Sequence, residues 1–296
     1  MIPTRNRPDL LVACLEALAA NTWSEHVEVI VVDDGSDIPL DSRIAPSGLR
    51  VTVTRCRGLG PGAARNVGIA RARAGIVLFT DDDTVPCKAW IEVAVSYLDS
   101  HPDCVGVDGP VRSPRWDPLT EVSIETDAPD HYWTCNVAYR RQTLVDLGGF
   151  RSDVFRFAHG EDRDLALRAL SHGRIGFDDR MEIVHTPRRL ALKEVYSRGR
   201  WAREALILYA LHPHLTREFT GPARLSLIWG ASTFLRAEIR ARNRFSPQRI
   251  GRALVMSLMA VAVTTATVVT TSSASVLRRR YGGAGGTLGQ EFECEH

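Results

Sequence analysis

Residues 74–83 read Ala-Gly-Ile-Val-Leu-Phe-Thr-Asp-Asp-Asp, an apolar run that leads directly into three carboxylates. The apolar part predicts a buried strand, and the acidic triplet stands where that strand ends. Adjacent negative charges need a partner, and a divalent cation is the natural one, because hard oxygen ligands suit Mg²⁺ and Mn²⁺. Such ions are commonly held by one or two carboxylates together with the phosphates of a substrate. A solvated acidic turn is the alternative interpretation, and the rest of the chain has to decide between the two.

Strands and helices alternate on both sides of this stretch. Residues 27–32 are mostly β-branched and end in Asp33 and Asp34, which is typical of a buried parallel strand that opens into a polar turn. Such alternation predicts βαβ units and a parallel sheet, with ligands at the carboxyl ends of the strands. We expect Gly75 to close the second helix. The predicted helices cover residues 8–21, 63–73, 88–98, 143–147 and 161–172, and the predicted strands cover 1–4, 27–32, 51–54, 74–79, 105–111, 133–141 and 177–184.

A glycine-rich loop, residues 58–62, precedes the helix expected at residues 63–73. The backbone N–H groups of such a loop can cradle phosphates. This loop matches neither the GxGxxG nor the Walker pattern, so a plain structural turn is equally consistent with the sequence.

A second acidic group opens the helix expected at residues 161–172. Capping and the helix dipole explain one acidic residue at a helix start, but Glu161, Asp162 and Asp164 together exceed what a cap requires. His185 follows the last predicted strand. A single histidine is more often structural than a ligand, so its role depends on its neighbours.

These features, in this order, resemble the family 2 glycosyltransferases, and the resemblance covers residues 2–189. Each motif is weak by itself, but six in the family's order make a chance match improbable. The motifs are Pro3-Thr4-Arg5-Asn6-Arg7, Val31-Val32-Asp33-Asp34-Gly35-Ser36, Ala64-Arg65-Asn66-Val67-Gly68, Thr80-Asp81-Asp82-Asp83, Gly148-Gly149-Phe150 and Gly160-Glu161-Asp162-Arg163-Asp164-Leu165.

The resemblance implies a GT-A fold for residues 1–189: an α/β catalytic domain with a mostly parallel, Rossmann-like sheet sandwiched by helices. It also implies transfer of a sugar from a nucleotide diphosphate donor to an acceptor hydroxyl, with inversion at the anomeric carbon and a Mn²⁺ or Mg²⁺ cofactor. The product would be a cell-envelope glycan or glycolipid, or a modified small molecule. In such a reaction a divalent ion neutralises the leaving diphosphate, and a carboxylate takes the proton of the acceptor.

On the donor side, the resemblance implies a role for each matching residue. The expected metal ligands are Asp83, Asp81 and His185. Pro3, Thr4 and Asp34 would contact the nucleoside, and Arg65 would lie near the ribose or diphosphate. Asp81 and Asp83 would fill the DxD positions, and His185 would lie beside the metal or diphosphate. Asp82 would lie at the nucleotide sugar, in a role that the three consecutive Asp residues leave open.

On the acceptor side, Asp162 would act as the base and Glu161 would orient the acceptor. Trp133 offers an apolar face on which a sugar could stack, with an ordinary core or lid position as the alternative. Asn136 is a further acceptor-side candidate.

Residues 190–280 are expected to form a helical, basic, membrane-associated extension. Residues 186–296 carry 17 Lys/Arg against 7 Asp/Glu, whereas residues 1–185 carry 20 against 28. Arg and Trp on apolar helices fit a membrane surface. Residues 253–277 contain no charge and are long enough to span a bilayer, with an interfacial or bundle helix as the alternative.

We therefore expect a location at the cytoplasmic face of the cell membrane, with the cytoplasm as the alternative. Nucleic acid is not expected as a partner, because the basic residues are interleaved with apolar stretches. Residues 281–296 are Gly-rich and then acidic, which predicts a disordered tail. Residues 1–4 look like the end of a strand, so we expect the start of the sequence to be internal or clipped.

Two other functions stay open at this point. A metal-dependent nucleotidyltransferase or phosphohydrolase also uses carboxylates at strand ends. A nucleotide-binding homologue without activity is the non-enzymatic alternative.

Overall fold

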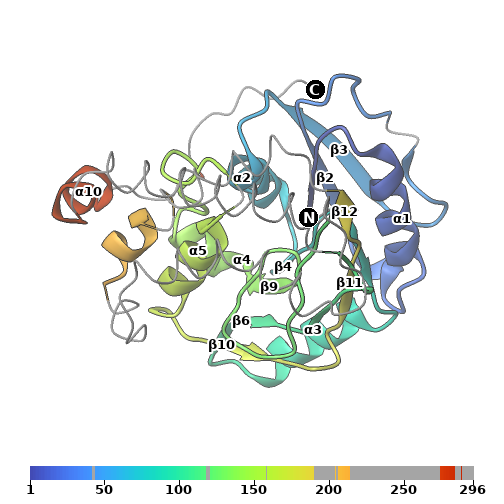
Figure 1. The fold of residues 1–296 in the computed structure, drawn as a ribbon. Helices are drawn as coiled ribbons and strands as arrows, with labels where there is room; N and C mark the ends of the chain where they lie inside the picture. The colour runs from blue at the N-terminus through green and yellow to red at the C-terminus, as the bar shows by residue number, and fades with distance from the viewer. Residues whose placement is uncertain are drawn as a thin grey trace, which may run out of the picture. The chain divides into compact units, whose positions relative to one another are not determined.

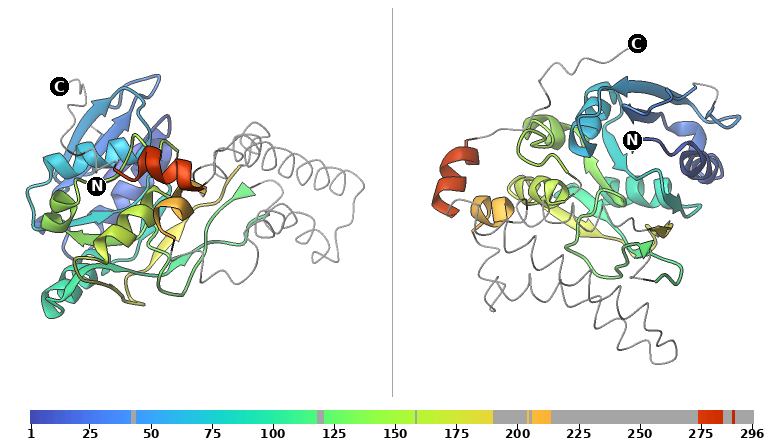
Figure 2. Two further views of the ribbon diagram at one scale, coloured as in Figure 1. Left: turned by 90° about the vertical axis from the view of Figure 1, so that its left-hand side faces the viewer. Right: turned by 45° about the horizontal axis from the view of Figure 1, so that its top comes forward.

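The computed structural model describes residues 1–41, 44–117, 121–157, 159–189, 204, 206–213, 274–283 and 288. These residues belong to two units, which are described separately. The first comprises Met1–Pro114, Ile124–Thr186 and Ala284–His296, and the second comprises Arg115–Ser123 and Pro187–Gly283. The elements of both units are drawn in Figure 1 and from two further directions in Figure 2.

The first unit contains most of the regular structure. Its helices are α1 (Pro8–Ala19), the 3-10 helix η1 (Ser24–His26), α2 (Pro61–Arg71), α3 (Trp90–Ser100), α4 (Arg141–Asp146) and α5 (Glu161–Ala169). Its strands are β1 (Ile2–Thr4), β2 (Val29–Asp34), β3 (Val51–Cys56), β4 (Ile76–Phe79), β5 (Thr84–Pro86), β6 (Cys104–Asp108), β7 (Val111–Arg112), β9 (Val137–Arg140), β10 (Arg174–Phe177) and β11 (Ile183–His185).

Seven of these strands form one continuous sheet. β1, β2 and β3 are parallel, and β10, β6, β9 and β4 are neighbours in that order. Met1 joins the two groups, because its amino group donates to the Leu78 carbonyl at 2.8 Å and its carbonyl accepts from Thr80 N at 3.2 Å. This is the parallel bonding pattern, so the order is β3-β2-β1-β4-β9-β6-β10, in which β9 runs antiparallel to both neighbours. The prediction of a mostly parallel sheet is confirmed.

Side chains alternate between the two faces of this sheet, and each face is covered by helices. In β2, Val29 and Val31 pack in the core cluster that holds the apolar sides of α1 and α3. Ile30 and Val32 pack in the other cluster, with the apolar sides of α2 and α5. Figure 1 shows α1 and α2 on either side of β2 and β3. The sheet is therefore sandwiched by helices, as predicted.

Three local predictions were wrong. The strand expected at residues 177–184 is two strands, β10 and β11, which are separated by a turn where Asp178 accepts hydrogen bonds from Arg180. The strand expected at residues 105–111 is interrupted after β6, where a Cβ on Gly109 would collide with the Met181 carbonyl. Gly75 does not close α2, which ends at Arg71 with Ala72 as its cap.

The second unit contains a two-stranded antiparallel ladder, β8 (Glu121–Val122) with β12 (Arg188–Arg189), and helix α10 (Ala274–Tyr281). Residues 206–211 are also helical. Of the span considered at residues 253–277, residues 253–273 lie outside the described part of the chain. None of the described helices is long and apolar enough to cross a membrane.

Of the tail expected at residues 281–296, only residues 281–283 and 288 lie in the described part of the chain, so its disorder stays a prediction. Tyr281 is the last residue of α10. Leu288 N donates to the Gly148 carbonyl at 2.7 Å, and its side chain packs against the core cluster of the first unit.

Asn66 fixes the segment that leads from α4 toward α5. Gly148 and Gly149 have φ angles of 70° and 72°, which a residue with a Cβ rarely adopts, and they turn the chain at the end of α4. The next residue, Phe150, is then held by the Asn66 side chain: Nδ2 donates to the Phe150 carbonyl at 2.9 Å, and Oδ1 accepts from Phe150 N at 2.8 Å. Phe150 is buried, so the Asn66 side-chain amide supplies the two backbone hydrogen bonds that a neighbouring strand would otherwise provide.

We expect Asn66→Ala to destabilise the protein by about 2–4 kcal/mol, because it leaves a buried N–H and a buried carbonyl of Phe150 without their partner. Urea unfolding measures this difference. The matched control is Gln142→Ala, which removes an exposed amide that binds Asp146 and should cost less than about 0.5 kcal/mol. Equal unfolding midpoints for the two variants would contradict the role given to Asn66.

Candidate active site

The acidic triplet follows β4 at the carboxyl end of the sheet, as the sequence predicted. The turn that leads into β5 is held by two threonines: Thr84 Oγ1 donates to the Asp81 carbonyl at 2.7 Å and lies 2.6 Å from Thr80 Oγ1. β5 then pairs antiparallel with β11, which places His185 opposite Thr84. The three consecutive carboxylates consequently face three different sets of neighbours.

Asp82 faces the end of β1. Thr4 Oγ1 donates to Asp82 Oδ2 at 2.7 Å, and Arg7 Nη1 donates to Asp82 Oδ1 at 3.0 Å. Burial raises the pKa of this carboxyl to about 6, although Arg7 and Thr4 oppose the shift. Asp82 therefore ties the triplet to β1, and its contact with a nucleotide sugar stays a prediction.

Asp83 lies between Arg7 and His185. Arg7 Nη1 donates to Asp83 Oδ2 at 3.1 Å, and His185 Nε2 lies 3.5 Å from Asp83 Oδ1. The backbone bond from Thr186 N to the Asp83 carbonyl, 2.8 Å long, holds the end of β11 in this place. Two atoms that bind one Mg²⁺ or Mn²⁺ ion at about 2.1 Å stand about 3.0 Å apart at a right angle and at most about 4.2 Å apart. Asp83 Oδ1 and His185 Nε2 therefore fit a shared cation.

A pair of protein ligands suits these ions. In the described part of the chain, no group of three or more His, Cys, Asp or Glu side chains gathers where it could hold a metal. Mg²⁺ and ions like it keep several waters and take oxygen ligands from substrate phosphates, so one or two protein ligands are enough.

Arg65 projects from α2 and joins the triplet to the second acidic group. Its Nη2 donates to Asp81 Oδ1 at 2.8 Å, and its Nη1 donates to Glu161 Oε1 at 3.1 Å. The guanidinium also lies 5.8 Å from the centre of the Phe150 ring. The Arg65 and Glu161 side chains are 4% and 3% exposed, whereas Asp81 is 29% exposed. Glu161 thus binds Arg65, and its expected contact with an acceptor stays a prediction.

Asp162 is the half-buried member of the second acidic group. It lies in the first turn of α5, which begins after Gly160 at a φ of 89°. Arg163 N donates to Asp162 Oδ1 at 2.7 Å. Burial raises the pKa of Asp162, and the nearby Arg65 opposes this shift. A carboxylate with a raised pKa is a stronger base than an ordinary one, which suits it to take a proton.

Asp164 anchors α5 from the opposite side. Its carboxylate is fully buried and accepts from Arg151 at 3.3 Å and from Arg168 at 2.9 Å. Arg168 also donates to the carbonyls of Leu147 and Gly149. Asp164 is therefore structural, and it fixes the helix start that carries Asp162.

Asp34 shapes the glycine-rich loop. Its Oδ1 accepts from Leu59 N at 2.7 Å, and its Oδ2 accepts from Gly60 N at 3.0 Å. Two N–H groups that could have cradled phosphate are therefore directed to a protein carboxylate. Pro3 lies half-buried in β1 opposite Val32. The nucleoside contacts expected of Pro3 and Asp34 stay predictions.

The two acceptor-side candidates lie on the core side of the site. Asn136 is buried, and its amide accepts from Trp90 Nε1 at 2.7 Å and donates to the carbonyls of Pro110 and Met181 at 2.9 and 2.7 Å. These bonds join three segments, and the acceptor-side role expected of Asn136 stays a prediction. Trp133 is half-buried against the α1 and α3 core cluster, with its ring 5.0 Å from that of His131.

Several residues that build the site were missed in the sequence. Arg7 and Asn66 stand in motifs, but nothing in the sequence indicates their partners, which lie 75 or more residues away. The Asp164–Arg168 pair was detectable, because the two residues are four positions apart on one helix.

We expect Arg65→Met to destabilise the protein by about 3–5 kcal/mol, because it leaves the buried Glu161 carboxylate without its cation. Arg65→Met with Glu161→Gln should recover part of this loss. The control is Arg73→Met, which breaks the ion pair with Glu28 on an 86% exposed side chain and should cost less than about 1 kcal/mol. Urea unfolding gives all three values, and an Arg65→Met cost no larger than that of Arg73→Met would contradict the account.

Asp108, at the end of β6, provides a pH test. Its buried carboxyl accepts from Tyr132 N at 3.2 Å, and burial raises its pKa to about 7. A folded pKa above the unfolded value means that the stability contribution is complete below about pH 4 and is lost as the pH rises through 7. Asp108→Asn keeps an acceptor for Tyr132 and removes the titration, so its stability relative to the wild type should rise by about 1–3 kcal/mol between pH 5 and 8. Thermal unfolding at both pH values measures this stability difference, with the exposed Asp99→Asn as the control. A stability difference between Asp108→Asn and the wild type that is the same at pH 5 and pH 8 would refute the raised pKa of Asp108.

Comparison with known proteins agrees with this geometry. The sequence model described as glycosyl transferase family 2 matches residues 1–159. Glycosyltransferase AglE of Haloferax volcanii is 28% identical over 166 residues, which are 51% of this chain and 54% of the relative. The chain spans about half the length of the curated relatives that head the comparison.

Two solved structures share the fold. S. aureus TarS, solved in complex with UDP-GlcNAc, superposes with a TM-score of 0.54 at 18% identity and covers 95% of this chain and 90% of that one. Mannosyltransferase PcManGT of Pyrobaculum calidifontis, solved with GDP-Man and Mn²⁺, gives a TM-score of 0.50 at 19% identity and covers 95% and 78%. The GT-A fold predicted from the sequence is confirmed. With the family model matching more than half of its residues, the chain belongs to glycosyl transferase family 2.

Proposed function

We propose that the protein transfers a sugar from a nucleotide diphosphate donor to an acceptor hydroxyl, with inversion at the anomeric carbon and with a divalent cation. The observation that carries this proposal is the pair formed by Asp83 Oδ1 and His185 Nε2, whose 3.5 Å separation fits a shared cation at the carboxyl end of the sheet. Arg65 connects the neighbouring Asp81 to the helix that carries Asp162. The proposed cation site and the proposed base would thus belong to one connected framework.

On the donor side, Asp83 and His185 would hold the cation. When bound, Mn²⁺ or Mg²⁺ neutralises the negative charge that develops on the diphosphate as the sugar leaves. Arg7 lies against Asp82 and Asp83 with 36% of its side chain exposed, so its guanidinium keeps these carboxylates in place and adds positive charge beside the phosphates. The nucleoside would lie at the ends of β1 and β2, next to Pro3, Thr4 and Asp34.

On the acceptor side, Asp162 would take the proton of the attacking hydroxyl. Inversion requires attack on the face opposite the leaving diphosphate, so the base has to be separate from the cation site. Asp162 stands in the first turn of α5, whereas Asp83 follows β4. Glu161 binds Arg65, and through this ion pair it would fix the start of α5, which carries Asp162. Trp133 would offer its ring to the acceptor sugar.

Two similar solved structures support the donor class. TarS was solved with UDP-GlcNAc, and PcManGT with GDP-Man and Mn²⁺. For the acceptor we propose a hydroxyl of a glycan, a glycolipid or a small molecule in the synthesis of cell-envelope glycans. For the location we propose the cytoplasmic face of the cell membrane, on the strength of the 17 Lys/Arg against 7 Asp/Glu in residues 186–296.

Incubation of the protein with a panel of nucleotide sugars and Mn²⁺ should release the nucleoside diphosphate. Asp162→Asn should lower kcat by about 10²-fold or more while the affinity for the nucleoside diphosphate stays the same, because only proton transfer is removed. Asp83→Asn should lose both turnover and the Mn²⁺ dependence of nucleotide binding.

Asp99→Asn, an exposed substitution on α3, is the control and should match the wild type. Wild-type turnover in both site variants would overturn the assignment. Release of pyrophosphate or inorganic phosphate in place of the nucleoside diphosphate would instead identify a nucleotidyltransferase or phosphohydrolase.

A further inference from the structure

The loop of residues 130–133 comes shortly before β9 and carries Trp133, which the proposed function places at the acceptor sugar. Two of its residues have a left-handed backbone, Asp130 with a φ of 71° and Tyr132 with a φ of 57°. Residues with a Cβ keep this conformation where their surroundings enforce it. The 130–133 loop is therefore held in its shape by its contacts.

Asp108 holds the middle of this loop. Tyr132 N donates to Asp108 Oδ2 at 3.2 Å, and the Tyr132 hydroxyl donates to Asp130 Oδ1 at 2.5 Å. Asp108 and Tyr132 are buried, whereas Asp130 is exposed. Asp108 is the last residue of β6, a strand with neighbours on both sides, so the bond from Tyr132 N ties the loop to the interior of the sheet.

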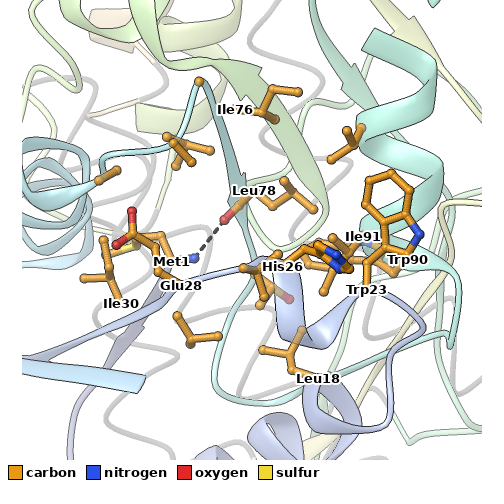
Figure 3. A pocket seen from close by; sticks show the side chains of 18 residues that line it. Met1, Leu18, Trp23, His26, Glu28, Ile30, Ile76, Leu78, Trp90 and Ile91 are labelled. Atoms are coloured by element: carbon orange, nitrogen blue, oxygen red, sulfur yellow. Dashed lines mark hydrogen bonds between the residues drawn. The ribbon is translucent and has the colours of Figure 1, made fainter. Parts of the chain in front are cut away.

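The end of the loop nearest β9 is anchored by groups that do not titrate. Asn136 N donates to the Trp133 carbonyl at 2.9 Å, and the Asn136 side chain accepts from Trp90 Nε1 at 2.7 Å. Trp90 is buried, and Figure 3 shows it at the side of an apolar pocket. Asp108 therefore supplies an ionisable link between the loop and the sheet, beside this fixed one.

The loop lies close to the acidic groups of the site. Burial raises the pKa of the Cys135 thiol, and the charges of Asp81 and Asp162 are among those that raise it further. Cys135 follows the loop by two positions, so both carboxylates are near its end. Burial also raises the pKa of the Tyr132 hydroxyl, and the positive charge of Arg163, the neighbour of Asp162 on α5, opposes that shift. The loop is thus near the helix start that carries the proposed base.

We propose that Asp108 is a positioning residue for the acceptor, which keeps Trp133 at the site by fixing Tyr132 and with it the 130–133 loop. This inference rests on the proposed function, because that function places an acceptor sugar at Trp133. Ionisation of Asp108 would release the loop, for reasons that lie in its surroundings.

Asp108 lies on the face of the sheet that α5 covers. It is two positions from Gly106, which pairs with Tyr139, so the Asp108 and Tyr139 side chains are on the same face. Tyr139 packs in the core cluster that holds the apolar side of α5. From this helix, the charges of Asp162 and Arg168 act on the Tyr139 hydroxyl, which is buried without a hydrogen-bond partner.

The immediate surroundings of Asp108 favour its neutral form. Its Oδ1 is buried without a hydrogen-bond partner, and among the described residues no lysine or arginine forms an ion pair with it. Asp130 faces it from the loop, and Asp178, whose N donates to the Asp108 carbonyl at 3.0 Å, is itself bound by Arg180. Burial raises the pKa of Asp108 to about 7, and the charge of Asp130 adds to this shift.

A buried carboxylate without a cation is costly, and water reaches it only when the loop moves away. The closed loop binds the proton of Asp108 more tightly than the open loop does. Closure is therefore favoured below pH 7 and is lost as the pH rises through 7.

The first test follows the loop by hydrogen exchange in the full chain, without donor or acceptor. After correction for intrinsic rates, the wild-type peptide that covers residues 128–136 should exchange at least fivefold faster at pH 8.5 than at pH 6. In Asp108→Asn the two rates should be equal, because the amide keeps an acceptor for Tyr132 N and does not ionise. In Asp108→Ala exchange should be at least fivefold faster at both pH values. Residues 29–34 of β2 are the internal control and should not change.

The second test measures transfer to the best acceptor from a panel of alkyl glycosides. Asp108→Ala should raise the acceptor KM at least tenfold at pH 6, whereas the donor KM should stay within twofold, because the proposed donor site lies at other strand ends. The acceptor KM of the wild type, divided by that of Asp108→Asn, should rise at least fivefold between pH 6 and pH 8.5. Asp99→Asn is the exposed control and should match the wild type.

Equal exchange of residues 128–136 in the wild type, Asp108→Asn and Asp108→Ala would overturn the hold of Asp108 on the loop. The expected exchange together with an unchanged acceptor KM in Asp108→Ala would overturn its role toward the acceptor, while the proposed function would stand. A wild type that releases no nucleoside diphosphate from any donor would overturn the proposed function and this role together.

Discussion

The Arg65 guanidinium is buried between two carboxylates that come from distant parts of the chain. Asp81 follows a central strand of the sheet, Glu161 opens α5, and Arg65 itself belongs to the helix after the glycine-rich loop. Charges taken out of water are tolerated only when each has its partner, so this arrangement holds the three segments in one relative position. The distance between the acidic triplet and the second acidic group is fixed by this contact.

The same principle operates at Asp82 and Asp83, which follow β4, and at Asp164 in α5. Arg7 binds Asp82 and Asp83, and Arg168 and Arg151 bind Asp164. Arg7 and Arg151 come from outside the elements whose acidic residues they bind, whereas Arg168 shares α5 with Asp164 and also binds the carbonyls of Leu147 and Gly149. In the proposed reaction, a cation and a diphosphate would enter a site whose carboxylates are already oriented, which is the preorganisation that electrostatic catalysis requires.

The fold and the position of the site were predictable because they depend on local patterns. Apolar runs that end in Asp33, Asp34 or Asp81 predict parallel strands, and the carboxyl ends of such strands meet at one edge of the sheet. The individual contacts depend on pairing between distant segments. The approach of His185 to Asp83 results from the antiparallel pairing of β5 with β11, and the sequence alone did not indicate a strand at β5. The bonds from the Asn136 amide to the buried carbonyls of Pro110 and Met181 likewise join segments that are far apart in the sequence.

The central claim is that Asp83 and His185 hold a divalent cation together with the donor diphosphate. The most direct measurement is an anomalous difference map, recorded near the manganese absorption edge, from crystals grown with Mn²⁺ and a nucleoside diphosphate. The account predicts one strong peak in contact with both Asp83 Oδ1 and His185 Nε2 and with phosphate oxygens of the nucleotide. A nucleotide bound at the ends of β1 and β2 with no manganese between these two side chains, or with manganese bound elsewhere, would contradict it.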